Sequence, residues 1–365
     1  MMLLIGIFIF IISLPCQSEN FFSDGEVNTF ELLLGTNDRL NDQSIQILAK
    51  NKMVILDRFR YREVGKNSWR KLKSQNKNLK VLLFQSGPKI KKHTDEDSVE
   101  YINNISRYEN SRGHSQGALV DNKEFFLLSK NGKKVSVLKK PDSVLMDFGD
   151  IFFQKYWLEA TMTDIVNKDW VADGVFIDAS FPYHQNNHGW RVCKNLYNYD
   201  DAEDWNPSMN NFIFNISQGM GRANQITMFN RGHTKREEGV RAWVDLDRKD
   251  HEPAIMMEEG AFVVSWGLGD AQFIKGNEWL RQVMLPQQIE HSSIAFASHI
   301  DIHMNEFGRT AFGRSFKGQQ AFRYAFASYL LAKRKNGKPS FFYFEHDRKK
   351  NGQFNKISWQ KIYGD

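Results

Sequence analysis

The chain has 365 residues, of which 41% are hydrophobic and 13% aromatic, and its formal net charge is +6. This length can bury a large core and suits one large α/β domain or two smaller ones. The positive charge is modest and no nucleic-acid-binding motif accompanies the lysine clusters, which argues against a nucleic-acid-binding protein.

An apolar run from Leu3 to Leu14 dominates the start of the chain. It is too short to cross the roughly 30 Å apolar core of a bilayer, but it suits the centre of a signal peptide. Cys16-Gln17-Ser18 then supplies a tolerable cleavage site. We therefore expect removal of residues 1–18, a secreted or periplasmic protein, and no membrane span in the mature chain. An uncleaved anchor at the membrane surface is the alternative.

Residues 19–365 contain no interdomain linker, low-complexity tract or short repeat, and we expect them to form a single domain. After cleavage at the predicted site the chain keeps one cysteine, Cys193. An intramolecular disulfide is then impossible, so the stability of the fold must come from its core.

Short apolar runs alternate with helical patterns from residue 30 onward. This alternation predicts parallel strands joined by helices, and eight such strands predict a (β/α)8 barrel, also called a TIM barrel. An open doubly wound sheet is the alternative, but it would need a glycine-rich phosphate loop after an early strand, and the sequence has none. The predicted strands are 30–35, 53–57, 80–87, 174–180, 225–232, 254–262, 294–303 and 340–347, and the clearest helical stretches are 151–168, 277–293 and 313–335.

Two connections are longer than a regular barrel requires. After the third predicted strand, a polar loop over 88–116 is followed by a predicted hairpin over 117–138, with Asn131-Gly132 as its turn. After the fourth strand, 181–205 is rich in asparagine, tyrosine and tryptophan. We therefore expect insertions after strands three and four.

Polar residues gather where the predicted strands end. In a barrel of this class the active site lies at the C-terminal ends of the strands. Asp178 ends the apolar run GVFIDAS, where a carboxylate is costly unless it is paired or used in chemistry; capping of the next turn is the structural alternative. The other candidates at strand ends are Asp57, Gln85, Asn230, Glu258, Glu259, His299, Asp301 and Glu345.

Two carboxylates that face each other across the barrel mouth can hydrolyse a glycosidic bond. One stays ionised, and the other is kept protonated so that it can donate to the leaving oxygen. Strand alternation aims only one of Glu258 and Glu259 inward, and we favour Glu259 because Gly260 lets the backbone bend beside it. Asp178 and Glu259 are therefore the predicted catalytic pair, with Glu258 as the alternative acid.

A sugar site also needs flat apolar platforms and polar groups that bind hydroxyls. The insertion after strand four offers Tyr183, Trp190 and Trp205, and Trp266 follows strand six. Each ring could instead pack its own loop. The predicted substrate-binding residues are Asp57, Gln85, Asp147, Tyr183, Trp190, Asn230, Trp266, His299, Asp301 and Glu345.

Two other functions compete with hydrolysis by a carboxylate pair. His299, Asp301 and His303 are spaced by two, which on a strand would point all three to one face and could chelate a divalent ion in a metal-dependent hydrolase. A non-catalytic carbohydrate-binding barrel is the other alternative. Under the favoured interpretation no metal or cofactor is expected, and the partner is a carbohydrate.

Several segments occur in an order that resembles a known family. They are VILDRF, VLLFQSG, VLMDFGD followed by FFQKYW, DGVFIDAS and MMEEGAF, within residues 30 to 347. The sequence is similar to the hypothetical glycosyl hydrolase family 15, which implies a TIM barrel. The arrangement also resembles the α-galactosidase-like clan of retaining glycosidases. That resemblance implies Asp178 as nucleophile and Glu259, or Glu258, as acid/base. A glutamate stands where the clan has an aspartate, which leaves retaining and inverting outcomes open.

Overall fold

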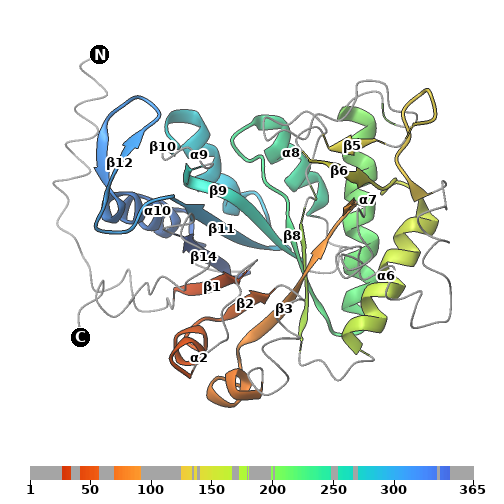
Figure 1. Cartoon of the computed structure of the whole chain (residues 1–365), viewed down its shortest axis with the longest axis horizontal. Helices are drawn as coiled ribbons and strands as arrows, with labels where there is room; N and C mark the ends of the chain where they lie inside the picture. Colours follow the sequence, from red (N-terminus) through yellow and green to blue (C-terminus); the bar gives the residue numbers. More distant parts are fainter. Residues whose placement is uncertain are drawn as a thin grey trace.

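A computed structural model describes most of the barrel and its helices. Eight parallel strands close into a barrel, which confirms the predicted fold class (Figure 1). Each predicted strand is present, with its ends shifted by a few residues. The described residues are 27–33, 42–56, 70–91, 125–133, 135–137, 140–166, 172–178, 180, 199, 202–247, 254–265, 270–334 and 338–345.

The barrel strands follow one another in chain order, and the last closes on the first. All eight pairings are parallel, including the pairing between β9 and β11 and the closure between β14 and β1. The strands are β1 (Asn28–Leu33), β2 (Met53–Leu56), β3 (Lys80–Ser86), β7 (Gly174–Asp178), β8 (Ile226–Asn230), β9 (Ile255–Ser265), β11 (Ser293–His299) and β14 (Ser340–Glu345).

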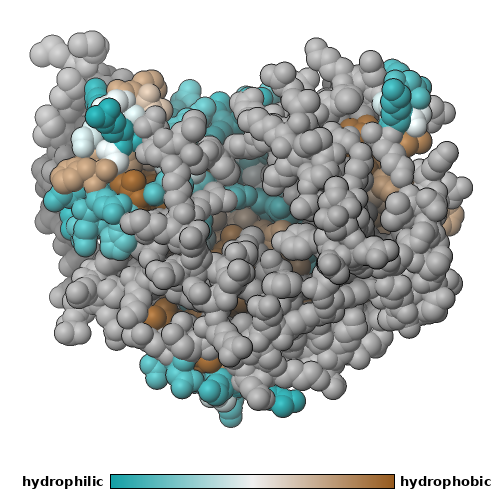
Figure 2. All heavy atoms as spheres, viewed as in Figure 1, coloured by the Kyte–Doolittle hydropathy of each residue, from teal (hydrophilic) through white to brown (hydrophobic). Residues whose placement is uncertain are grey.

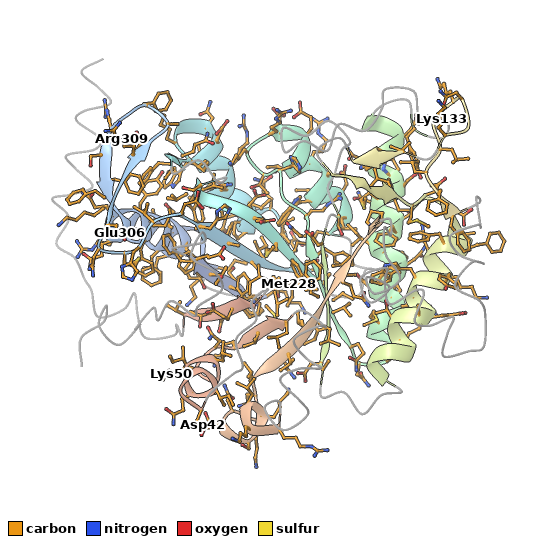
Figure 3. All side chains as sticks on the ribbon, in the orientation of Figure 1. Asp42, Lys50, Lys133, Met228, Glu306 and Arg309 are labelled. Carbon is orange, nitrogen blue, oxygen red and sulfur yellow. The ribbon has the colours of Figure 1, made fainter. Side chains whose placement is uncertain are left out.

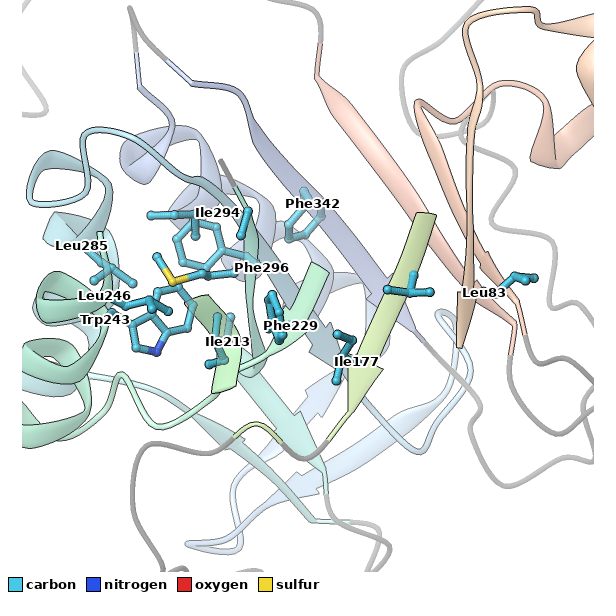
Figure 4. Packing of buried hydrophobic residues seen from close by; sticks show 14 of the residues in the cluster. Leu83, Ile177, Ile213, Phe229, Trp243, Leu246, Leu285, Ile294, Phe296 and Phe342 are labelled. Carbon is cyan, nitrogen blue, oxygen red and sulfur yellow. The ribbon is translucent and has the colours of Figure 1, made fainter. Parts of the chain in front are cut away.

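Side chains alternate between two apolar layers along the barrel strands other than β1, as the pleat requires, while β1 contributes to the inner layer. The inner layer fills the barrel, and Met228, near the middle of Figure 3, belongs to it. The outer layer packs between strands and helices, as Figure 4 shows for Ile177 and Phe229 against Ile213. The inner layer consists of Phe30, Met53, Ile55, Leu82, Phe176, Met228, Ile255, Met257, Ala295, Ala297 and Tyr343.

Helices cover the outside of the barrel, and two of them differ from the sequence prediction. The helix predicted over 277–293 ends at Met284. Pro286 has no backbone N–H to continue the α-helical hydrogen bonding, and the chain goes on as a 3-10 turn, η3 (Leu285–Gln287). The predicted helix over 313–335 begins late, since a strand precedes it. The helices are α2 (Asp42–Leu48), α6 (Ile151–Val166), α7 (Ala202–Gly221), α8 (Glu237–Leu246), α9 (Gly276–Met284) and α10 (Gly318–Ala332). Among the described residues, no helix combines the length and apolarity needed to cross a membrane.

Two groups of short strands are added to the barrel. Between β3 and β7, β4 (Lys89–Lys91), β5 (Ser136–Val137) and β6 (Lys140–Leu145) form an antiparallel sheet. Before β5, Ser129 and Lys133 pair across a turn in which Gly132 has φ +76, at the predicted Asn131-Gly132 position.

The second group extends β9. Strand β10 (Asp270–Phe273) pairs with the end of β9, and the hairpin of β12 (Phe307–Thr310) and β13 (Ser315–Lys317) continues outward from β10. The sequence interpretation did not anticipate this extension, because short strands with exposed faces lack the continuous apolar runs that mark barrel strands.

Candidate active site

One side-chain nitrogen of Asn230 joins the two predicted catalytic carboxylates. Its Nδ2 atom donates to Oδ1 of Asp178 at 2.9 Å and to Oε2 of Glu259 at 2.6 Å. The two oxygens are therefore at most 5.5 Å apart. Asn230 itself is 1% exposed, so protein packing holds this bridge in place.

Strand alternation explains why these three residues meet. Asp178 lies two residues beyond Phe176, Asn230 two beyond Met228, and Glu259 two beyond Met257, and all three of those apolar residues fill the barrel interior. Strands β7, β8 and β9 are neighbours in that order. The inward side chains at their C-terminal ends consequently converge on one point.

The same alternation brings two further predicted residues to the inner face. His299 lies two residues beyond Ala297 on β11, and Glu345 lies two residues beyond Tyr343 on β14. Ala297 and Tyr343 belong to the inner layer, and His299 pairs with Glu345 across the two strands. The ring of polar side chains thus continues over β7, β8, β9, β11 and β14, which are consecutive around the barrel. The molecule is indented along its upper edge, between the part that carries β12 and the part that carries α7, and the described residues visible there are mainly hydrophilic (Figure 2).

A bulge in β9 follows Glu259 directly. Glu259 pairs with Ala297, and Val264 pairs with His299. Five residues of β9 therefore span the length that two residues span on β11. Gly260 has φ +85, and Phe262 has φ +59, which is a strained value for a bulky residue. Bulges next to active sites re-aim side chains, and this one ends the regular pairing at the residue that bonds Asn230.

Gln282 on α9 stabilises this bulge. Its Oε1 accepts the backbone N–H of Phe262 at 2.9 Å, and its Nε2 donates to the Thr234 hydroxyl at 3.2 Å. Gln282 is fully buried. It therefore links the bulge of β9 to the loop that follows β8.

Arg231 holds the chain just beyond Asp178. Its buried guanidinium donates to the carbonyl oxygen of Ser180 at 2.9 Å and to the side chain of Asn210 on α7. The backbone N–H of Ser180 also donates to the carbonyl oxygen of Asn230. Burial lowers the pKa of Arg231 to about 9, which leaves it charged at neutral pH.

Glu258 occupies the opposite face of β9 from Glu259. It is 1% exposed, and its Oε2 accepts the backbone N–H of Thr234 at 2.9 Å. Burial raises the pKa of Glu258 to about 7, and the charge of Glu259 adds to the rise, while Thr234 and Lys235 oppose it. The structure therefore places Glu259, and not Glu258, beside Asp178.

The HIDIH segment does not present three ligands on one strand face. Strand β11 ends at His299, after which the Ile300 N–H donates to the Glu345 carbonyl and the chain turns. His303 starts a turn, and its own backbone N–H donates to the Glu306 carboxylate. No group of three histidine, cysteine, aspartate or glutamate residues suited to a metal ion occurs in the described part of the chain.

Two predicted substrate-binding residues lie apart from the carboxylate pair. Gln85 is on the outer face of β3, where its amide donates to Thr161 of α6 at 3.2 Å. Asp147 accepts hydrogen bonds from the Tyr199 hydroxyl at 2.5 Å and from the Gly149 backbone at 3.1 Å. Burial raises the pKa of Tyr199, and the acidic neighbour Asp147 raises it further.

Four other predicted residues, Asp57, Tyr183, Trp190 and Trp266, lie outside the described residues. Trp205, which the sequence offered as a sugar platform, is 5% exposed on α7 and packs edge-on against Phe148 with ring centroids 4.5 Å apart. It is a core residue, because its helix faces the outer apolar layer of the barrel.

The sequence interpretation did not name Gln282 and gave Arg231 no role. An arginine directly after a buried strand was a usable signal, because a buried guanidinium needs several acceptors. Gln282 gave no such signal, since a glutamine within an amphipathic helix is ordinary.

The chain matches the hypothetical glycosyl hydrolase family 15 over residues 64–360. It belongs to this family. The match covers well over half of the chain and includes the strands that carry Asp178, Asn230 and Glu259. No curated protein has a significant sequence match to it.

Several solved glycosidases have a distantly similar fold. A variant of the GH36 alpha-galactosidase AgaA from Geobacillus stearothermophilus in complex with raffinose is 10% identical, with a TM-score of 0.45, and aligns over 90% of this chain and 40% of its own. The galactosidase domain of the alpha-galactosidase-sucrose kinase AgaSK is 10% identical, with a TM-score of 0.42, over 89% and 38%. A xylosidase from Aspergillus niger is 8% identical, with a TM-score of 0.41, over 73% and 37%. This family member spans about two fifths of the length of each of these enzymes.

Proposed function

We propose that this barrel hydrolyses glycosidic bonds, with Asp178 as nucleophile and Glu259 as acid/base. The observation that carries the proposal is the shared Asn230 nitrogen, which holds one oxygen of each carboxylate within 5.5 Å of the other. Carboxyl groups about 5–5.5 Å apart are typical of retaining glycosidases, whereas inverting enzymes need about 6.5–9.5 Å. The proposal therefore includes retention of anomeric configuration.

The residues divide the reaction into two displacements. In the first, an oxygen of Asp178 bonds to the anomeric carbon while the bond to the leaving oxygen breaks, and Glu259 gives that oxygen its proton. In the second, water loses a proton to Glu259 and its oxygen replaces Asp178 on the carbon. The transition states carry positive charge on the sugar, which a nearby carboxylate stabilises more than it stabilises the neutral substrate.

The first test is hydrolysis of a panel of 4-nitrophenyl glycosides. Replacement Asp178→Asn keeps the shape and removes the charge, and we expect at least about a 1,000-fold loss of turnover with the fold intact. Glu259→Gln should slow substrates with poor leaving groups most, because those need the proton. Turnover near the wild-type rate in Asp178→Asn would reject the proposed mechanism.

A second test addresses retention directly. A 2-deoxy-2-fluoro glycosyl fluoride of the best panel sugar should accumulate as a covalent adduct, and peptide mass spectrometry should find it on Asp178. Product NMR should show the substrate's anomeric configuration first. Immediate appearance of the opposite anomer would show that Asp178 acts as a base for water and would contradict the nucleophile assignment.

The same assays separate the competing functions. A non-catalytic carbohydrate-binding barrel would bind glycans without turnover in the wild-type protein. A metal-dependent hydrolase would lose activity on dialysis against EDTA, and we expect none to be lost, since catalysis is assigned to two carboxylates.

We also propose that the protein acts outside the cytoplasm on a polysaccharide or glycoconjugate. The support is the apolar run from Leu3 to Leu14, which suits a signal peptide. N-terminal sequencing of the protein recovered from its native host should start near residue 19. Recovery of intact Met1 from the cytoplasmic fraction would reject export.

A further inference from the structure

The β12–β13 hairpin displays aromatic and basic side chains together. Phe307 is 68% exposed and Phe312 is 77% exposed, so among the described residues they are two of the three most exposed large hydrophobic side chains. Lys317 lies over the Phe307 ring at 5.0 Å, and Lys275 lies over the Phe312 ring at 4.7 Å. Large exposed apolar groups with a polar surround often mark a binding surface.

One face of the β12–β13 hairpin is buried and the other is exposed. Gly308 and Phe316 are opposite each other and buried, and a Cβ at Gly308 would lie 2.9 Å from Phe316. The other face therefore carries Phe307 and Arg309 on β12, opposite Lys317 and Ser315 on β13. Packing accounts for the buried face, but it gives no reason for a phenylalanine on the exposed face.

Charge on this surface is mainly positive. Lys275, Arg309, Arg314 and Lys317 are exposed, and Glu306 is the exposed acid beside them among the described residues. We call Phe307, Phe312 and these four basic residues the hairpin face. An aromatic ring can stack on one side of a sugar ring while neighbouring cations attract the sugar's acidic groups.

The hairpin face is attached to the strand that carries Glu259. Strand β9 runs through its bulge to Ser265, β10 pairs with that end of β9, and β12 pairs with β10. Both connections that build the face leave the C-terminal ends of barrel strands, which is where the active site lies. Figure 3 places Arg309 near the upper edge, away from Asp42 and Lys50 at the lower edge.

We propose that the hairpin face binds an anionic glycan chain and that such a glycan is the substrate class of the active site. Only the statement about the substrate class rests on the proposed function, and binding at the hairpin face does not depend on it. The shared chemistry is a chain of sugar rings bearing carboxylate or sulfate groups. The rings stack on Phe307 and Phe312, and the acidic groups pair with the four basic side chains.

Binding is measured with the full chain carrying Asp178→Asn, so that turnover does not remove the ligand. The probes are polygalacturonate for carboxylates, dextran sulfate for sulfates, neutral dextran, and single-stranded oligothymidylate of matched charge. We expect binding to at least one of the two anionic glycans, weaker at high salt, and none to dextran. Which anionic glycan binds identifies the acidic group.

Two sets of variants test the surface. Phe307→Ala with Phe312→Ala should weaken glycan binding about tenfold, because both aromatic stacking contacts are lost. Arg309→Gln with Arg314→Gln should weaken it similarly and reduce its salt dependence. The matched controls are Phe152→Ala, which removes a ring 70% exposed on α6, and Lys133→Gln, on the far side of the molecule from Arg309 in Figure 3. Both controls should bind as the parent does.

Any one of four results would overturn the inference. They are no binding of either anionic glycan, equal binding of dextran, binding of oligothymidylate that is as tight and does not depend on the phenylalanines, or no change in the hairpin variants. Turnover of aryl glycosides without any glycan binding at the hairpin would reject this inference and leave the proposed function standing. Glycan binding without turnover of any substrate would keep the surface and reject the catalytic proposal.

Discussion

The backbone N–H of Gly87 donates to the carbonyl oxygen of Asp178 at 2.9 Å, and a Cβ at position 87 would lie 2.6 Å from that same oxygen. The loop after β3 therefore holds the end of β7 through a contact that only glycine permits. Gly87→Ala should shift the Asp178 backbone, because a carbonyl oxygen cannot tolerate so close a carbon. We expect about 1–3 kcal/mol of lost stability and roughly a 100-fold loss of kcat/KM, as a displacement of about 1 Å at the reacting groups can produce.

Gly132→Ala is the matched control for this change. Gly132 has φ +76 and no neighbour within 4 Å, so alanine adds backbone strain of roughly 1 kcal/mol at a turn remote from the carboxylates. Urea midpoints and aryl glycoside kinetics should show a stability loss in both variants and a kinetic loss in Gly87→Ala alone. Wild-type kcat/KM in a folded Gly87→Ala protein would contradict this positioning role.

Removal of the amide bridge is the second prediction. Asn230→Ala deletes the nitrogen that bonds Asp178 and Glu259, and loss of one such preorganised donor typically lowers kcat about 100- to 1,000-fold. Asn215→Ala removes a comparable amide, which donates to Gln154 between α7 and α6, and should leave kcat/KM unchanged. Equal kinetics for the two variants would show that the bridge has no catalytic consequence.

The third prediction concerns the pH dependence of stability. Burial raises the pKa of Glu258 from 4.5 to about 7, so between these values the folded state binds more protons than the unfolded state. The contribution of Glu258 to stability is therefore complete below about pH 4.5 and is lost as the pH rises through about 7. Over that range we expect the wild type to lose up to roughly 3 kcal/mol relative to Glu258→Gln.

Urea unfolding at several pH values measures this difference. The pKa of Glu31 is also raised, to about 8, by burial and by Glu345, but this contribution is common to both proteins and cancels in the comparison. Parallel curves of unfolding free energy against pH would mean that Glu258 is charged in the folded protein at pH 5. Such a result would require its interactions with Thr234 and Lys235 to outweigh its burial.

The fourth prediction tests the support of the bulge. Gln282→Ala leaves the buried N–H of Phe262 without its acceptor, which costs about 1–3 kcal/mol and frees a backbone held at φ +59. We expect kcat to fall with stability, because the bulge aims Glu259. Gln154→Ala, which removes another buried glutamine that bonds a backbone carbonyl, should lower stability without lowering kcat. A stability loss with unchanged kcat in both variants would exclude any role of the bulge in aiming Glu259.

Much of the fold was predictable from sequence because both faces of each barrel strand are buried. Runs such as GVFIDAS then stay apolar until the strand reaches the barrel mouth, and the first polar residue marks that end. This logic predicts that Asp178, Asn230 and Glu259 lie together at the barrel mouth. The same logic could not tell which way the Gln85 side chain points. When a strand is apolar on both faces, its sequence does not show which alternate side chains point into the barrel, and only the pairing with a neighbouring strand decides this.

The remaining features depend on contacts that are remote in sequence. The expectation that His299, Asp301 and His303 share a face assumed a strand through residue 303, yet the strand ends at His299. The bulge after Glu259 follows from pairing with β11 and from Gln282 on α9, and Gly260 was its one local sign. The role of Arg231 likewise depends on its acceptors, Ser180 and Asn210, which are remote from it in sequence.

The order β7, β8, β9 has a consequence for stereochemistry. Two strand spacings separate the backbones that carry Asp178 and Glu259 by roughly 10 Å, so the sheet alone would leave room for a water molecule between short side chains. The approach to within 5.5 Å comes from side-chain reach. The side chain at position 259 therefore sets the separation of the two carboxylates, within limits that the strands fix.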